Sequence, residues 1–258
     1  MLRRAILTVL LYATMLAAGA TDFTATWWIP TESGQGYTFT QNGNFIFATF
    51  FVYSPTTGSA WYTGQLTLDA TGKFTGPLYA TTGPWFGTVP FNPGLVTINQ
   101  VGNATFQPTA ADTGVLTYNV ASTQVVKNIQ RQTLVPIALS GSYVGGLAVS
   151  DTSCSNSANN GPANVPVNMQ VTQSQTGQIQ IAFSVLNTPA CTFASSGPVA
   201  QTGQLFTFPA AYTCSDGTNV TATVSELRTT SLGIEGRWTA PNVGGCHEEA
   251  QFGGVLQY

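Results

Sequence analysis

The sequence has very little charge. Only 7% of its 258 residues are charged, with seven basic residues, ten acidic residues and one histidine. Removal of Arg3 and Arg4 with a predicted signal peptide leaves five basic against ten acidic residues, a net charge of −5. Five basic residues cannot neutralise a row of phosphates, so nucleic acid is excluded as a partner and anionic membrane surfaces are disfavoured.

Long apolar runs are also missing. No segment approaches the roughly 18 uninterrupted apolar residues of a membrane span, so we expect no transmembrane helix. The N-terminus instead has the pattern of a secretory signal: two arginines, a short apolar stretch over residues 5–16, and a small-x-small site at 18–20. We therefore predict a signal peptide over 1–20, cleavage near Ala20, and a secreted protein that is periplasmic or extracellular.

Most catalytic signatures are missing as well. There is no Gly-x-Ser-x-Gly elbow, phosphate-binding loop, dinucleotide fingerprint or Cys-x-x-Cys pair. The single histidine lies in His247-Glu248-Glu249, where a strand would place His247 and Glu249 on one face and Glu248 on the other. We interpret this as a solvated strand start. We expect no metal site and no cofactor, and we favour a non-catalytic protein over an enzyme.

Glu32 is the one acidic residue of the first half that needs a separate explanation. Asp69 and Asp112 lie in turn sequences, where their side chains cap backbone amides. Glu32 follows two tryptophans, and a buried carboxylate without a partner is costly. We favour a structural ion pair with Arg131. The alternative is a hydrolase that uses Glu32 as a general acid and requires a second acid nearby.

The composition predicts an all-β protein, because Thr, Val, Phe and Tyr are common whereas Lys, Glu and Arg are rare. Apolar runs alternate with turn clusters throughout. The first half has predicted strands at 37–41, 45–53, 59–68, 73–80, 95–101, 104–107, 115–120 and 125–132, with a Gly/Pro-rich loop at 81–93. The second half has them at 141–149, 165–173, 178–186, 191–195, 205–214, 220–227, 232–240 and 247–257, with a loop at 151–164.

A change of composition near Leu134 divides the chain. Four of the five tryptophans precede this point and all four cysteines follow it. We predict two antiparallel meander domains, at 23–134 and 138–258. Each is expected to be a roughly eight-stranded up-and-down barrel of the lipocalin or avidin type, because closure removes both exposed edges.

The meander selects one of the three possible cysteine pairings. Cys191 and Cys214 lie symmetrically about a hairpin tip near Thr202, so they face each other across adjacent strands. Cys154 follows the first strand of the second domain and Cys246 precedes the last, and these strands are neighbours in a closed barrel. We therefore predict the disulfides Cys154–Cys246 and Cys191–Cys214, as expected for an exported protein.

The aromatic residues of the first domain exceed what a small core needs. Trp28, Trp61, Tyr62, Trp85 and Phe86 are candidate ligand-binding residues, because such rings suit sugars and flat apolar ligands. Core or rim packing is the alternative for any one of them. The partner would be a small molecule, a glycan or a surface component. A structural protein of the envelope or matrix is the alternative to a binding module.

The opening of the mature chain also carries a recurrent motif. Its residues are Trp27-Trp28-x-Pro30-x-Glu32-Ser33-Gly34-x-Gly36, followed by Gln41-x-Gly43-Asn44-x-x-Phe47 and Trp61-Tyr62. With Lys127-x-Ile129-x-Arg131-Gln132, this pattern over residues 26–132 is similar to a β-rich module of exported bacterial proteins. The four-cysteine half, with Gly141-x-Tyr143-x-Gly145-Gly146, resembles domains found beside it. The resemblance implies export and β structure; it assigns no activity and no catalytic residue.

Overall fold

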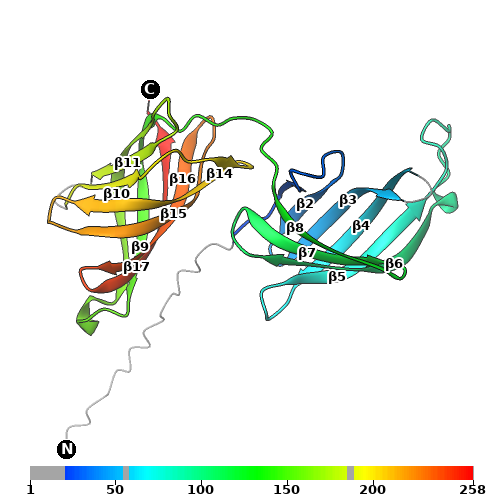
Figure 1. Ribbon diagram of the computed structural model, residues 1–258, viewed down its shortest axis with the longest axis horizontal. Coiled ribbons are helices and arrows are strands. Elements are labelled where there is room, and N and C mark those ends of the chain that lie inside the picture. The colour runs from blue at the N-terminus through cyan, green and yellow to red at the C-terminus, as the bar shows by residue number, and fades with distance from the viewer. Residues whose placement is uncertain (1–20, 55–57, 185–188, 258) are drawn as a thin grey trace, which may run out of the picture.

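The computed structural model describes residues 21–54, 58–184 and 189–257, so the predicted signal peptide lies outside the described residues. Within these ranges the chain is almost entirely β, with two short 3₁₀ helices, η1 (Pro93–Leu95) and η2 (Ser157–Asn159). The strands form two sheets, which the linker 132–140 joins (Figure 1). No helix in the described ranges is long and apolar enough to cross a membrane.

The first sheet is a closed antiparallel barrel with its eight strands in sequence order. They are β1 (Ala25–Trp28), β2 (Gly36–Asn42), β3 (Phe45–Ser54), β4 (Gly58–Leu68), β5 (Phe74–Thr82), β6 (Thr97–Pro108), β7 (Thr113–Val120) and β8 (Thr123–Arg131). β1 pairs with both β2 and β8, and Trp27 lies opposite Arg131. The predicted up-and-down barrel is confirmed.

The predicted number of eight strands in the first barrel is correct, but two of the predicted strands are assigned wrongly. The predicted strands 95–101 and 104–107 are parts of the single strand β6, and the eighth strand is β1. The break near Gly102 is an irregularity in the β5–β6 register, not a turn. Glycine is required there because a Cβ at Gly102 would lie 1.8 Å from the backbone oxygen of Asn119.

Aromatic and aliphatic side chains fill the interior of the first barrel. Phe106 is fully buried, and its ring centroid lies 4.9 Å from that of Phe39 and 5.1 Å from that of Trp27. Other fully buried members of this core are Ile46, Phe50, Leu66, Leu78 and Leu116. The barrel interior is therefore a packed core, so the candidate binding residues of this domain have to act from its outer surface or its ends.

The second sheet closes in the same way. Its strands are β9 (Gly141–Thr152), β10 (Gly161–Gln173), β11 (Ile179–Ser184), β12 (Cys191–Ser195), β13 (Gln201–Thr202), β14 (Leu205–Cys214), β15 (Asn219–Thr229), β16 (Gly233–Val243) and β17 (Cys246–Leu256). β17 pairs with β9, and β12 pairs with β14, so eight strands form a ring. The short β13 adds only a two-residue pairing with β14.

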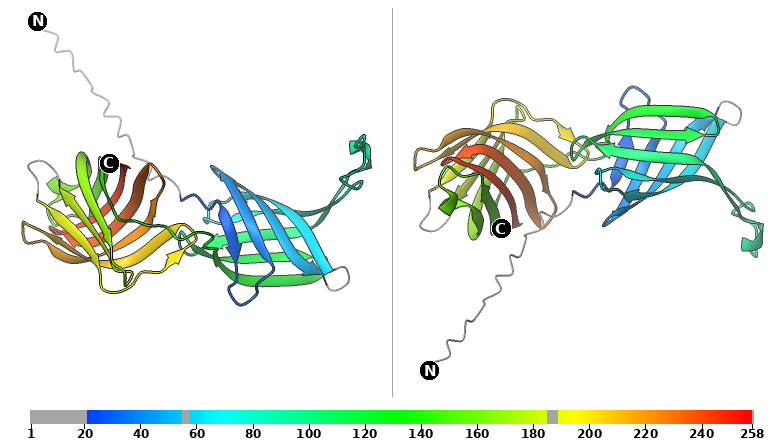
Figure 2. Two further views of the ribbon diagram at one scale, coloured as in Figure 1. Left: turned by 90° about the horizontal axis from the view of Figure 1, so that it is seen from above. Right: turned by 90° about the horizontal axis from the view of Figure 1, so that it is seen from below.

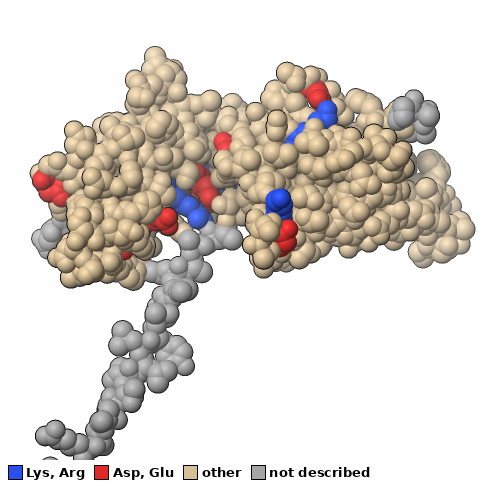
Figure 3. Space-filling view, turned by 60° about the horizontal axis from the view of Figure 1, so that its bottom comes forward, with Lys and Arg blue, Asp and Glu red and all other residues tan. Residues whose placement is uncertain are grey.

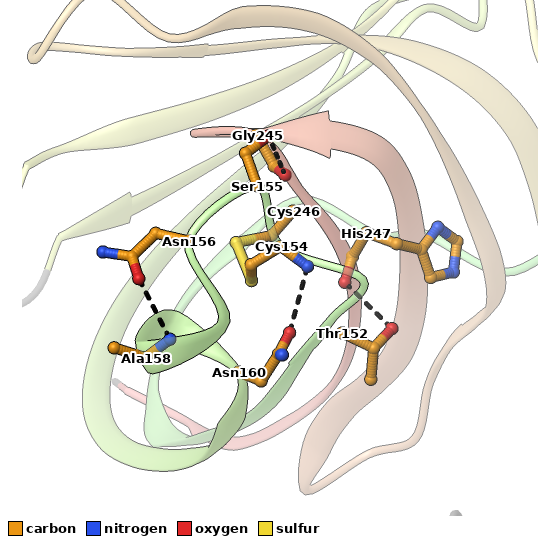
Figure 4. Close-up of a disulfide and its surroundings, with 9 residues drawn as sticks. All are labelled: Thr152, Cys154, Ser155, Asn156, Ala158, Asn160, Gly245, Cys246 and His247. Carbon is orange, nitrogen blue, oxygen red and sulfur yellow. Dashed lines mark hydrogen bonds between the residues drawn. A yellow bond between two sulfur atoms is a disulfide. The ribbon is translucent and has the colours of Figure 1, made fainter.

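Two disulfides cross-link the second barrel as predicted. Cys191 lies directly opposite Cys214 in the β12–β14 register, and the bond spans 23 residues of sequence. Cys154–Cys246 spans 92 residues and joins the chain after β9 to the start of β17. Asn160 supports this end, because its side-chain oxygen accepts a hydrogen bond of 3.0 Å from the Cys154 amide (Figure 4). The strand ends that carry the two disulfides lie opposite the end where the linker enters.

The predicted loop at 151–164 is shorter than expected. β9 continues to Thr152 and β10 begins at Gly161. Asp151 is therefore a strand residue, and it lies opposite Glu248 in the β9–β17 register.

Charged side chains gather where the two barrels meet, near the centre of the face in Figure 3. A cavity of about 230 Å³ there is lined by Asp22, Arg131, Glu226, Arg228, Glu235 and Arg237, together with apolar neighbours. Arg237 lies 3.4 Å from Glu226, and Arg228 pairs with Glu235. These opposite charges satisfy one another across the strands of the second barrel, which favours a structural role for the cluster.

Candidate binding sites

Glu32 pairs with Lys127, so the predicted partner Arg131 is wrong. The Lys127 ammonium donates to both carboxylate oxygens of Glu32, at 2.7 and 2.8 Å, and Gln35 donates to one of them. The reason is strand direction. Trp27 lies opposite Arg131, and β1 and β8 are antiparallel, so residues that follow Trp27 lie beside residues that precede Arg131. Glu32 follows Trp27 in the chain and therefore lies beside Lys127, which precedes Arg131. The carboxylate has a structural partner, which removes the main argument for a hydrolase.

Arg131 has a different role in the same barrel. It is buried, and its guanidinium donates to the backbone oxygens of Ala111, at 2.8 Å, Thr24, at 3.2 Å, and Asp22. The guanidinium carbon also lies 5.3 Å from the ring centroid of Trp27. Arg131 thus connects residues 22–27 to the closing strand β8 through hydrogen bonds to carbonyl groups and a cation–π contact, not through a carboxylate.

The five aromatic residues predicted to bind a ligand do not form one site. Tyr62 packs against the core of the first barrel, and the indole nitrogen of Trp28 is buried without a hydrogen-bond partner. Trp61 is exposed on β4, where it packs beside Phe51. Only Trp85 and Phe86 form an exposed pair, with ring centroids 5.3 Å apart.

Trp85 and Phe86 belong to a protruding segment, residues 83–96, which we name the aromatic arm. It connects β5 to β6 and extends beyond the barrel at the end away from the second barrel (Figure 2). Its exposed apolar side chains are Trp85, Phe86, Val89, Phe91, Leu95 and Val96. Phe86 is 90% exposed and Trp85 68%. An apolar set this exposed is a candidate interaction surface.

Local hydrogen bonds give the aromatic arm a defined shape. The Thr88 amide donates to the Trp85 oxygen at 2.9 Å, which closes a turn, and the Gly94 amide donates to the Asn92 side chain at 2.9 Å before η1. The sequence between Lys73 and Asp112 contains no charged residue and no histidine. The arm thus presents an ordered, uncharged, aromatic tip.

A second candidate site lies at the disulfide-bearing mouth of the second barrel. Glu248 is only 7% exposed there, and its carboxylate accepts a 2.7 Å hydrogen bond from the Trp238 indole. Burial raises the pKa of Glu248, and the charge of Asp151 raises it further, whereas hydrogen bonds from Trp238 and Tyr212 oppose the rise. Burial and the nearby Glu248 also raise the pKa of Tyr212. The carboxylate is held by neutral donors.

The mouth around Glu248 contains a cavity of about 260 Å³. Phe193 and Tyr212 stack there with ring centroids 4.2 Å apart, and Trp238 lies 4.8 Å from Phe193. Asp216 is the second carboxyl group of the lining, and no basic side chain is present among the described residues that line it. The site combines an aromatic wall with negative charge.

No protein-family model matches the sequence. The search of curated proteins gives no significant match either. Two solved structures show a remote likeness. One is the isotype 1 transferrin binding protein B from serogroup B Neisseria meningitidis, with 11% identity and a TM-score of 0.33 over 87% of this chain and 66% of that chain, just under two thirds of its length. The other is a protein of unknown function from the DUF3598 family of Nostoc punctiforme, with 10% identity and a TM-score of 0.30 over 92% and 94% of the two chains.

Sequence reasoning missed Glu248 although a signal was present. Strand alternation does place it opposite to His247 and Glu249, as expected. The same alternation puts it on the face of Cys246 and Ala250, and that face is buried. The interpretation of a solvated strand start is therefore wrong for Glu248, because only the other face of β17 is open to solvent.

Proposed function

We propose that this protein is an exported, non-catalytic binding module that attaches to a surface through the aromatic arm of its first barrel. The observation that carries the proposal is the concentration of exposed apolar side chains on an ordered, uncharged protrusion. The packed interior of the first barrel supports an external binding mode over a ligand held inside it. The two disulfides fit export, which a signal peptide over residues 1–20 would direct.

The chemistry of the arm favours a neutral lipid surface. Trp and Phe side chains partition into the interface of a lipid layer, and burial of one large apolar side chain contributes about 1.5–3 kcal/mol. A cationic patch, which would favour anionic lipids, is not present on the arm. A glycan would instead need several polar side chains beside the rings, and the arm has two, Thr88 and Asn92, of which Asn92 already accepts a hydrogen bond from the Gly94 amide. Zwitterionic lipid is therefore the partner we commit to.

Sedimentation of the purified protein with phosphatidylcholine vesicles tests this function. We expect the protein to pellet with the vesicles, and the double substitution Trp85→Ser with Phe86→Ser to leave it in the supernatant. No described side chain of the arm belongs to the buried core of the first barrel or packs against it, so the far-UV spectrum of the variant should be unchanged.

A matched pair of leucines controls for general hydrophobicity. Leu95 in the arm is 60% exposed, and Leu232 in the β15–β16 turn of the second barrel is 72% exposed. Leu95→Ala should weaken vesicle binding by about tenfold, because it removes roughly 1–2 kcal/mol of apolar burial, whereas Leu232→Ala should change it by less than about twofold. Equal losses in the two variants, or a wild-type protein that stays in the supernatant, would exclude the lipid surface.

A further inference from the structure

The mouth of the second barrel contains a buried carboxylate, and none of the described residues that line its cavity carries a positive charge. Trp238 and Tyr212 donate hydrogen bonds to Glu248, and both donors are neutral. The charge of Asp151 acts against the ionised form of Glu248, and Asp216 is a further carboxyl group in the lining of the same cavity. A buried carboxylate is stable only when it is paired, protonated or neutralised by a ligand. A ligand with a positive charge would therefore stabilise the ionised form of Glu248.

The side chains around the carboxylate define the rest of the ligand. Phe193, Tyr212 and Trp238 form one wall of the cavity, and aromatic rings attract organic cations through their faces. Leu147 and Val165 add aliphatic surface. A cavity of about 260 Å³ lies just below the usual range for small-molecule sites, so it suits a body of no more than about one ring.

A bare metal ion does not fit these side chains. Among the described residues, no group of three or more His, Cys, Asp or Glu side chains could hold a metal. The cavity lining is mostly apolar and aromatic, whereas hard cations require several oxygen ligands. An organic cation uses both parts of the site at once.

From these observations we propose that the mouth of the second barrel binds a small organic amine or quaternary ammonium compound. The positive group lies against Glu248, and the apolar body lies among Phe193, Tyr212 and Trp238. This site is separate from the aromatic arm and does not depend on the proposed surface binding. Because a cation binds the ionised carboxylate, binding should strengthen as pH rises and Glu248 deprotonates, with Asp151 and Asp216 titrating in the same direction.

Calorimetric titration with phenethylamine, benzyltrimethylammonium and cyclohexylmethylamine tests the site. The neutral alcohol 2-phenylethanol and the anion phenylacetate serve as controls of the same apolar body. We expect saturable binding of at least one cation, at least about tenfold weaker binding of 2-phenylethanol, and no binding of phenylacetate. Failure of all three cations, or equal affinity for phenethylamine and 2-phenylethanol, would overturn the proposal.

Neighbouring residues on β17 offer a matched pair of variants. Glu248 faces the cavity and Glu249 faces solvent. Glu248→Gln keeps an oxygen that accepts from Trp238 but removes the charge, so cation affinity should fall by about tenfold or more to the level of the alcohol. Glu249→Gln should stay within about twofold of the wild type. An equal loss in the two variants would mean that long-range charge, not the cavity, attracts the cation, and the proposed site would be wrong.

Discussion

Glu248→Gln should make the protein more stable at neutral pH. The native state holds the Glu248 proton more tightly than the unfolded chain does, because burial and Asp151 raise the pKa of this carboxyl. The unfolded chain therefore binds fewer protons in the interval between the ordinary pKa of 4.5 and the raised native pKa. Stability falls as pH rises through that interval, and the carboxylate destabilises the native state above it.

The size of the effect follows from the burial of the carboxylate. When the native and unfolded states differ by one bound proton, the free energy of unfolding changes by at most about 1.4 kcal/mol per pH unit. Glutamine has the shape of the protonated acid and still accepts the hydrogen bond from Trp238, so the variant and the wild type should be equally stable near pH 4. At pH 8 we expect the variant to be about 1–3 kcal/mol more stable, the usual range for a buried polar group with incomplete compensation.

Urea unfolding between pH 4 and pH 8, with the disulfides intact, measures this difference. Trp238 is the tryptophan of the second barrel, whereas the other four lie in the first, so the part of the fluorescence transition that Trp238→Phe removes is assigned to the second barrel. Glu249→Gln is the control, because a surface substitution should change stability by less than about 0.5 kcal/mol. A Glu248→Gln protein that is less stable than the wild type at pH 8, or a difference that does not vary with pH, would refute the reasoning.

Three other predictions concern the first barrel and are tested by urea unfolding. Phe106→Ala should destabilise it by about 3–5 kcal/mol because it leaves a cavity among packed rings, whereas Phe47→Ala, on the outer face of β3, should lose less than about 1 kcal/mol; similar losses would contradict the packed interior. Lys127→Met should lower stability by less than about 1 kcal/mol, since both partners of the Glu32 pair are about 30% exposed, and a double-mutant cycle with Glu32→Gln isolates that term. Gly102→Ala should prevent normal folding of the barrel because its Cβ would overlap the backbone oxygen of Asn119, and a native-like unfolding curve would contradict this close approach of β6 to β7.

Much of the fold could be predicted because the strands and turns follow from local sequence patterns and because consecutive strands pair with one another. Alternation of apolar and polar residues fixes the strands and the inward faces, and the cysteine pairing follows from which strands are neighbours. Gly102 was misread for the same reason. A glycine between two apolar runs is typical of a turn, and only the partner strand shows that the backbone there stays extended and that the Asn119 carbonyl leaves no room for a side chain.

The sites were harder to predict because they depend on register. The sequence predicts that the first and last strands of the first barrel are neighbours. Choosing between Lys127 and Arg131 as the partner of Glu32 also requires the antiparallel offset between β1 and β8. Asp151 was assigned to a loop, so its position opposite Glu248 could not be inferred. The exposure of Trp85 was the easiest feature to predict, because this residue lies in a Gly/Pro-rich segment with no strand pattern to turn it inward.

Quenching of tryptophan fluorescence by phosphatidylcholine with brominated acyl chains tests surface attachment most directly. Bromine quenches only those tryptophans that enter the lipid layer, and Trp85 is the exposed tryptophan at the tip of the arm. Trp85→Phe keeps an aromatic ring, so the variant should still pellet with vesicles. We expect brominated vesicles to quench part of the wild-type emission, and this part should be lost in Trp85→Phe. Equal quenching of the two proteins, or none in either, would contradict this expectation.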